Sequence, residues 1–126
     1  MINRILIPDI LQPVSHYCHA VEAKGIIWVS GLVGMSFDGT IPDNTKDQFD
    51  IAMRDLNTCL EAAGGSSSDV VKVRVFLIDI ADRAIINPRR IEYFGAHKPA
   101  STLLEISALV DPRMRVEIEA EAVISK

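Results

Sequence analysis

The sequence has little cysteine and no long apolar run. Its two cysteines, Cys18 and Cys59, are too few for a disulfide framework, so we expect both to be reduced. No apolar stretch reaches the length of a membrane span. The first eight residues lack the apolar core and cleavage site of a signal peptide. These absences predict a cytoplasmic protein without a membrane partner.

The sequence also lacks the common motifs of catalytic and cofactor-binding sites. The 126 residues contain no phosphate-binding loop, dinucleotide fingerprint or nucleophile elbow, and no internal repeat. A formal net charge of -4 argues against a nucleic-acid partner. His16 and His19 flank Cys18, but residues three apart on a strand point to opposite faces, so we expect no metal site. Ser30 has no visible base, which favours a turn or hydrogen-bonding role over a nucleophilic one.

The most regular pattern lies near the carboxyl end. Apolar and charged residues alternate from residue 113 to 124, which predicts a strand with one face on a core. The other face carries Glu117, Glu119 and Glu121, about 7 Å apart at the rise of a strand. This acidic row is either a solvated face or the lining of a wet cleft where one carboxylate moves protons. The alternation itself does not decide between the two.

The remaining pattern suits one domain, residues 1–126, in which 48% of the residues are hydrophobic. Helices are expected from Thr45, as a cap with Gln48, to Ala63, and from the Asn87-Pro88 pair to Phe94. Strands are expected over residues 2–7 at a sheet edge, 15–22 and 26–31 as a hairpin, 70–80, 101–106 and 113–124. Two helices are too few to cover both faces of such a sheet. The order therefore predicts an α+β two-layer fold with a mixed sheet, helices on one face, and a bare face suited to oligomerisation.

Six short segments now suggest a family. They are VSHY (14–17), WVSG (28–31), LEAAG (60–64), DVVKV (69–73), PA (99–100) and VEIEAEA (116–122). In this order and spacing the chain resembles, over almost its whole length, the Rid family, also called YjgF or reactive-intermediate deaminase. The resemblance implies a chorismate-mutase-like fold and a homotrimer with a central barrel and clefts between subunits. It further implies hydrolysis of reactive enamines and imines to 2-keto acids and ammonia, without a metal or organic cofactor.

The same resemblance implies a set of site residues. Glu117 would position or activate the attacking water, and a small-molecule substrate would bind Tyr17, Ser30, Gly31 and Asn87. The chain departs from the family at Ser101, where active deaminases carry an arginine that binds the substrate carboxylate. Loss of such a charged pair costs about 2–5 kcal/mol of binding. We therefore expect poor hydrolysis of imines of simple 2-keto acids.

Ser101 leaves several functions open. One is deamination with an altered substrate range, and 2-aminomuconate is one alternative substrate. Arg74, Arg113 or Arg115 are then the candidates to bind the substrate carboxylate in place of the family's arginine. A trimer that binds a metabolite without turnover is another alternative. A ribonuclease role, which has been attached to some relatives, conflicts with the acidic balance and with the lack of a basic patch.

Overall fold

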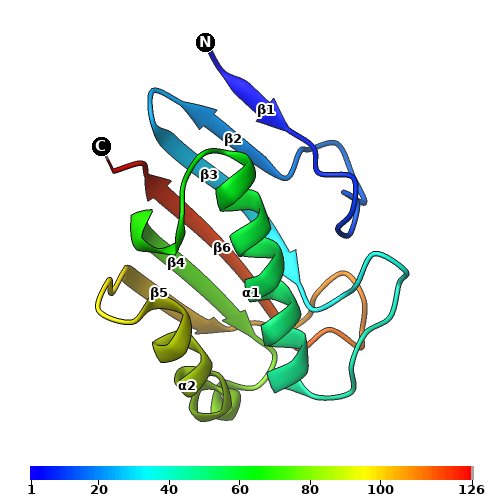
Figure 1. Cartoon of the computed structure of the whole chain (residues 1–126). Coiled ribbons are helices and arrows are strands. Elements are labelled where there is room, and N and C mark those ends of the chain that lie inside the picture. Colours follow the sequence, from blue (N-terminus) through cyan, green and yellow to red (C-terminus); the bar gives the residue numbers. More distant parts are fainter. Residues whose placement is uncertain (126) are drawn as a thin grey trace.

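The computed structural model describes residues 1–125, and within them the strands form one mixed sheet in the order β1-β2-β3-β6-β4-β5 (Figure 1). Strands β4 and β5 are parallel, and every other neighbouring pair is antiparallel. The predicted order of strands and helices is confirmed. The elements are β1 (Asn3–Ile5), β2 (Ala20–Ala23), β3 (Ile26–Val33), α1 (Thr45–Ala62), β4 (Val70–Leu77), α2 (Arg83–Phe94), β5 (Ala100–Glu105) and β6 (Val116–Val123), with short 3-10 turns η1 (Ser67–Asp69) and η2 (Ile80–Asp82).

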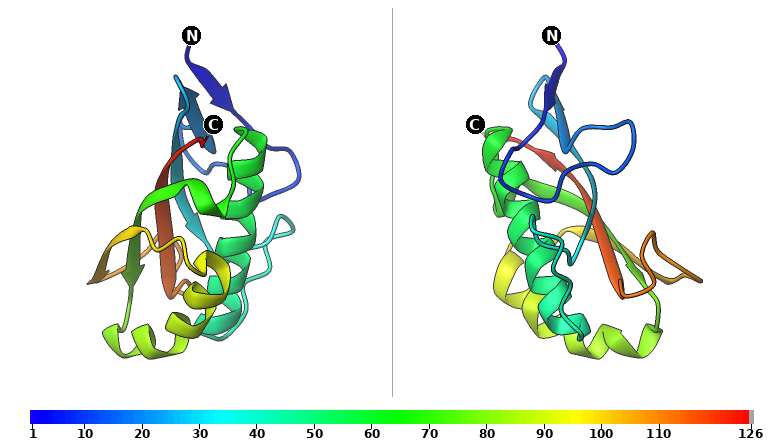
Figure 2. Two further views of the ribbon diagram at one scale, coloured as in Figure 1. Left: turned by 60° about the vertical axis from the view of Figure 1, so that its left-hand side comes forward. Right: turned by 90° about the vertical axis from the view of Figure 1, so that its right-hand side faces the viewer.

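Helices α1 and α2 cover the same face of the sheet, and the opposite face is bare, as predicted (Figure 2). The hydrophobic core lies between the two layers. Phe49, Leu56 and Leu60 of α1 are fully buried there against the inward residues of β3, β4 and β6. In residues 1–125, neither helix is long and apolar enough to cross a membrane.

Strand β6 lies between β3 and β4 at the centre of the sheet, and its alternation is the predicted one. Val116, Ile118, Ala120 and Ala122 are buried in the core. The acidic row of Glu117, Glu119 and Glu121 therefore lies on the bare face.

The predicted strand over residues 15–22 is wrong in its first part, because β2 begins at Ala20. His19, which is buried, explains the difference. Its Nδ1 accepts a hydrogen bond from the Ile7 backbone N–H at 2.9 Å, and its Nε2 donates to the Leu11 carbonyl at 2.8 Å. These contacts hold the chain before β2 as a loop folded against the preceding segment, and Tyr17 lies in that loop.

The helix starts also differ from the prediction. Asn44, not Thr45, caps α1 by accepting from the Asp47 N–H at 2.8 Å, and Thr45 instead donates to Asp82 at 2.6 Å. Helix α2 begins at Arg83, so the predicted start at Asn87 is wrong and Pro88 lies inside the helix. The earlier start follows from η2, which leads directly into α2.

Two irregularities change strand boundaries. Strand β3 continues to Val33 instead of closing at Gly31, with a register shift against β6 between Val29 and Leu32. Strand β4 ends at Leu77, and a similar shift at its start leaves Val71 exposed, although the alternation predicts a buried side chain.

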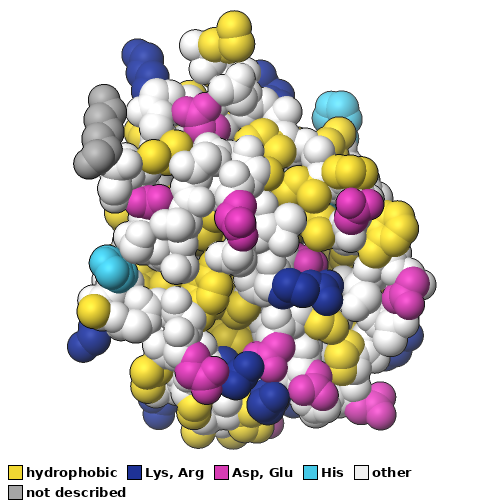
Figure 3. Space-filling view, viewed as in Figure 1, with side chains coloured by type: hydrophobic (Ala, Val, Ile, Leu, Met, Phe, Trp, Pro, Cys, Tyr) yellow, Lys and Arg dark blue, Asp and Glu magenta, His cyan; other side chains and the backbone are white. Residues whose placement is uncertain are grey.

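An ion pair across the helix layer fixes α2 against α1. Arg89 of α2 donates to Asp50 of α1 at 2.7 Å. Close by, Tyr93 donates to Asn57 at 3.1 Å. Figure 3 shows this helix-covered side, where hydrophobic side chains floor a hollow between the helices and charged groups of both signs gather along its lower rim. The contacts hold the face of α2 that carries Asn87 in a defined place beside β5.

Candidate functional site

A β-bulge in β3 forms the centre of the candidate site. Three steps along β3, from Val29 to Leu32, match two steps along β6, from Ala120 to Ile118, so β3 has one extra residue there. A bulge bends its strand and re-aims its side chains, and bulges are frequent beside active sites. Ser30 and Gly31 occupy this bulge, directly beside Glu117 of β6.

Gly31 and Glu117 are in unusually close contact. A Cβ atom added at Gly31 would lie 2.5 Å from Oε2 of Glu117 and 2.9 Å from its Cδ. Both distances are far below van der Waals contact, so no side chain fits at position 31 while the carboxylate keeps this position. Glycine is needed here for close approach and not for its backbone angles.

The three carboxylates of the acidic row are not equivalent. Arg74 of β4 pairs with Glu119 at 3.2 Å and with Glu121 at 2.9 Å. No hydrogen bond or ion pair from residues 1–125 reaches the Glu117 carboxylate, which is half-buried. Burial, and secondarily the charge of Glu119, raise the pKa of Glu117. An unpaired, partly desolvated carboxylate is suited to proton transfer, which favours the wet-cleft interpretation at this end of the row.

Ser30 joins the bulge to the loop before β2. Its hydroxyl donates to the Cys18 carbonyl at 2.7 Å, and its backbone N–H donates to the His19 carbonyl at 3.0 Å. The Ser30 hydroxyl therefore takes part in a hydrogen bond that holds the backbone. These bonds hold the loop beside Glu117, so that the exposed ring of Tyr17 lines the same hollow as Ser30 and Gly31.

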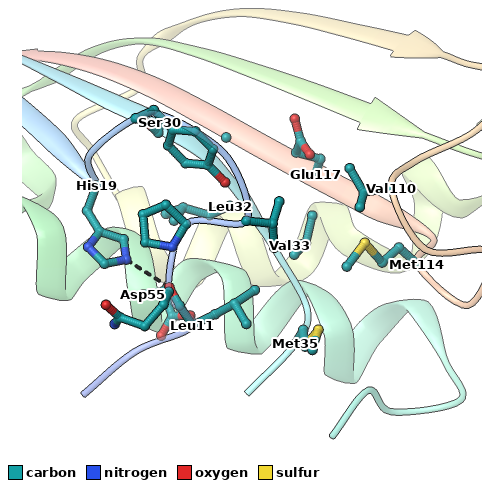
Figure 4. A pocket seen from close by; sticks show the side chains of 15 residues that line it. Leu11, His19, Ser30, Leu32, Val33, Met35, Asp55, Val110, Met114 and Glu117 are labelled. Atoms are coloured by element: carbon teal, nitrogen blue, oxygen red, sulfur yellow. Dashed lines mark hydrogen bonds between the residues drawn. The ribbon is translucent and has the colours of Figure 1, made fainter. Parts of the chain in front are cut away.

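Behind the bulge the hollow continues into a small cavity of about 70 Å³, shown in Figure 4. Glu117, Val110 and Met114 lie at one end of it, and His19 and Leu11 at the other. Since both ring nitrogens of His19 are bonded to backbone groups, this histidine is not free to act as a base. The cavity can hold water or a small apolar group next to the Glu117 carboxylate.

The other two predicted residues, Asn87 and Ser101, line a separate open hollow of about 600 Å³ between α2 and β5. Asn87 and Arg90 are three apart on α2 and so share one face of the helix. Arg90 donates from Nη2 to the Ser101 hydroxyl at 2.8 Å. The rest of the lining includes Ile91, Phe94, Gly95, Lys98 and Pro99.

The structure therefore brings Glu117, Tyr17, Ser30 and Gly31 together, whereas Asn87 and Ser101 lie in a hollow that shares no lining residue with theirs. Sequence reasoning missed Arg90. Its position three residues after Asn87 in a predicted helix was the available signal.

Comparison with known proteins gives the family. The model described as Endoribonuclease L-PSP matches residues 8–124. A RutC family protein of Pyrococcus horikoshii is 35% identical over 117 residues, covering 88% of this chain and 89% of the relative. The 2-iminobutanoate/2-iminopropanoate deaminase of Mus musculus is 35% identical over 113 residues, covering 87% and 82%.

Solved structures show the same fold. RidA from an Antarctic Psychrobacter has a TM-score of 0.92 at 28% identity, covering 97% of this chain and 99% of that one. The TdcF protein of E. coli, solved with bound serine, has a TM-score of 0.89 at 26% identity, covering 98% and 100%. The sequence match and the shared fold agree over nearly the whole chain, and on both grounds the chain belongs to the Rid (YjgF/L-PSP) family.

Proposed function

We propose that this chain is a homotrimeric deaminase that hydrolyses a small enamine or imine to a carbonyl product and ammonia. The observation that carries the proposal is the Glu117 carboxylate. It is half-buried, lies against the β3 bulge, and has no ion pair within residues 1–125, while Arg74 pairs with both Glu119 and Glu121. The deaminase names of relatives such as the mouse protein support the same chemistry.

Glu117 supplies the proton transfers that this hydrolysis needs. An imine that solvent has protonated at nitrogen accepts water at its carbon while Glu117 takes one proton of that water, which gives a carbinolamine. Glu117 then returns its proton to the nitrogen, and the C–N bond breaks as the hydroxyl group loses its proton to solvent, which releases ammonia and leaves a C=O group. An enamine first gains a proton at carbon, which gives the same protonated imine. A raised pKa increases the protonated share of the carboxyl at a given pH, which assists the step in which Glu117 acts as an acid.

The division of the predicted residues between two hollows supports a shared cleft. If all of them serve one substrate, a second copy of the chain must bring its Asn87 and Ser101 to the Glu117 of the first. The bare sheet face also has the character of an interface, because Trp28, on a strand central to the sheet, is 43% exposed. A closed trimer with three such clefts satisfies both features.

Turnover is tested with imines generated in situ from amino acids by an oxidase, with ammonia release as the readout. Glu117→Gln is expected to lower kcat by about 10²- to 10⁴-fold, the usual contribution of a general acid–base group. Glu119→Gln is the matched control, because it removes a carboxylate that is already paired with Arg74. If the two variants lose activity equally, or if the control alone loses it, the assignment to Glu117 fails.

Assembly is tested by light scattering during size-exclusion chromatography. We expect three times the chain mass of 13.9 kDa at micromolar concentration. A mass equal to a single chain contradicts the shared cleft. A trimer that binds metabolites but turns over no imine favours the binding function instead.

A further inference from the structure

The hollow between α2 and β5 contains the guanidinium of Arg90 close to position 101, where this chain lacks the family's arginine. Ser101 stands where active deaminases carry their carboxylate-binding arginine. The Arg90 side chain reaches this serine from α2, with Nη2 placed 2.8 Å from the Ser101 hydroxyl oxygen. A positive charge is therefore present next to position 101, although it comes from a different element.

Arg90 is available for an anion, unlike the arginines that the sequence offered as replacements. Arg74 pairs with Glu119 and Glu121, Arg113 with Asp111, and Arg115 with Asp82. Within residues 1–125, Arg90 makes no ion pair with a carboxylate. Its recorded side-chain partner is the neutral hydroxyl of Ser101.

The surroundings of Arg90 strengthen its attraction for an anion. The side chain is half-buried beside Ile91, Phe94 and Pro99, and this burial lowers the pKa of the guanidinium. Arginine nevertheless stays protonated in proteins. A cation that has lost part of its hydration and has no counter-charge is stabilised by a bound carboxylate more than an exposed cation would be.

We propose that Arg90, oriented by Ser101, binds the carboxylate of the substrate and so replaces the family's arginine at position 101. One N–H of Nη2 is used on Ser101, which leaves further guanidinium N–H groups for a two-point contact. Ser101 accepts from Arg90 and retains its own O–H to donate to the same anion. The substrate class is then an imine or enamine that carries a carboxylate, and the poor activity expected from Ser101 alone is replaced by activity that depends on Arg90. This inference rests on the proposed function for the identity of the reacting group.

Binding of a product and its uncharged analogue tests the inference without any turnover. The probes are 2-oxobutanoate and 2-oxobutanamide, which differ in the carboxylate, with affinity measured by titration calorimetry. The wild-type trimer should prefer the acid. Arg90→Met should weaken binding of the acid by about 10- to 150-fold and leave binding of the amide unchanged. Arg83→Met is the control, because Arg83 is an exposed cation at the first position of the same helix.

Two further variants separate charge from geometry. Arg90→Lys keeps the charge without the planar donor pair, so it should recover only part of the selectivity for the acid. Ser101→Ala should weaken binding of the acid less than Arg90→Met does, since it removes the group that orients the guanidinium.

The outcomes separate this inference from the proposed function. If Arg90→Met loses the preference for the acid while wild type releases no ammonia from any imine, Arg90 is the anion site and the deaminase proposal fails. If Arg90→Met binds the acid as tightly as wild type and Arg83→Met do, the inference is overturned whatever the activity. Equal binding of acid and amide by wild type overturns it as well.

Discussion

Gly31→Ala should impair the activity of the site without destabilising the fold. The new Cβ would lie 2.5 Å from Oε2 of Glu117, roughly 1 Å inside ordinary contact, so the carboxylate must move by a similar distance. A displacement of about 1 Å in a reacting group costs on the order of 100-fold in rate. We therefore expect kcat/KM for ammonia release from an imine to fall about 100-fold.

The stability of the Gly31→Ala variant, unlike its activity, should not fall. The backbone of Gly31 is not in the positive-φ region, so alanine fits its conformation. The Glu117 side chain lines an open hollow and can swing into it. Replacing such a glycine reduces the entropy of the unfolded chain and stabilises a protein by about 0.4–1 kcal/mol. Urea unfolding should therefore show an unchanged or slightly higher midpoint.

Gly25→Ala is the matched control, because it should lose stability without losing activity. Gly25 has a φ of 79° in the turn between β2 and β3, and a Cβ added there meets nothing within 4 Å. Alanine should cost about 1 kcal/mol of stability through backbone strain and leave kcat/KM unchanged. The reasoning is refuted if Gly31→Ala keeps wild-type kcat/KM, or if it loses activity only in proportion to a loss of folded protein.

Three further predictions follow from the same contacts. Glu119→Gln removes one of the two causes that raise the pKa of Glu117. The acidic limb of the pH profile of kcat/KM should therefore move to lower pH. If the limb does not move, the charge of Glu119 does not influence the pKa of Glu117. A raised folded-state pKa means that ionisation of Glu117 opposes folding at pH values above the ordinary glutamate pKa. Glu117→Gln should therefore raise the free energy of unfolding at about pH 7 and leave it unchanged at about pH 3, where the carboxyl is protonated in both states. A loss of stability at pH 7 would contradict this sign. Gly34, directly after β3, is packed so closely that Gly34→Ala would press a Cβ onto the backbone of Gln48 in α1. We expect a loss of about 1–3 kcal/mol of stability, seen as a lower urea midpoint. An unchanged midpoint would show that the contact between residue 34 and α1 is loose.

The parts of the fold that depend on local pattern were predictable. The alternation along β6, the amphipathic stripe of α1 and the turn at Gly25 are each encoded within a short stretch. The start of α2 was not, because a local Asn87-Pro88 signal competes with η2, which is capped when Asp79 accepts from the Ala81 N–H at 2.9 Å. The loop before β2 was missed since the partners of His19 lie 8 and 12 residues away.

The site shows the same division. Periodicity and resemblance together pointed to Glu117, but the reason it differs from Glu119 is a cross-strand contact with Arg74, 45 residues earlier in the chain. The extra residue of the β3 bulge appears only when β3 and β6 are paired. Arg90 was missed because its meaning depends on the distance to Ser101, which only the packing of α2 against β5 fixes.

The central claim, that one cleft is built from the Glu117 side of one chain and the Ser101 side of another, is tested most directly by subunit mixing. Glu117→Gln removes the carboxylate, and Ser101→Trp fills the hollow between α2 and β5. Each variant alone should be inactive. When the two are co-expressed in equal amounts, random trimers place an intact Glu117 opposite an unfilled hollow in about a quarter of the clefts, so about a quarter of the wild-type ammonia release should return. Mixed trimers with no more activity than the separate variants would contradict the shared cleft.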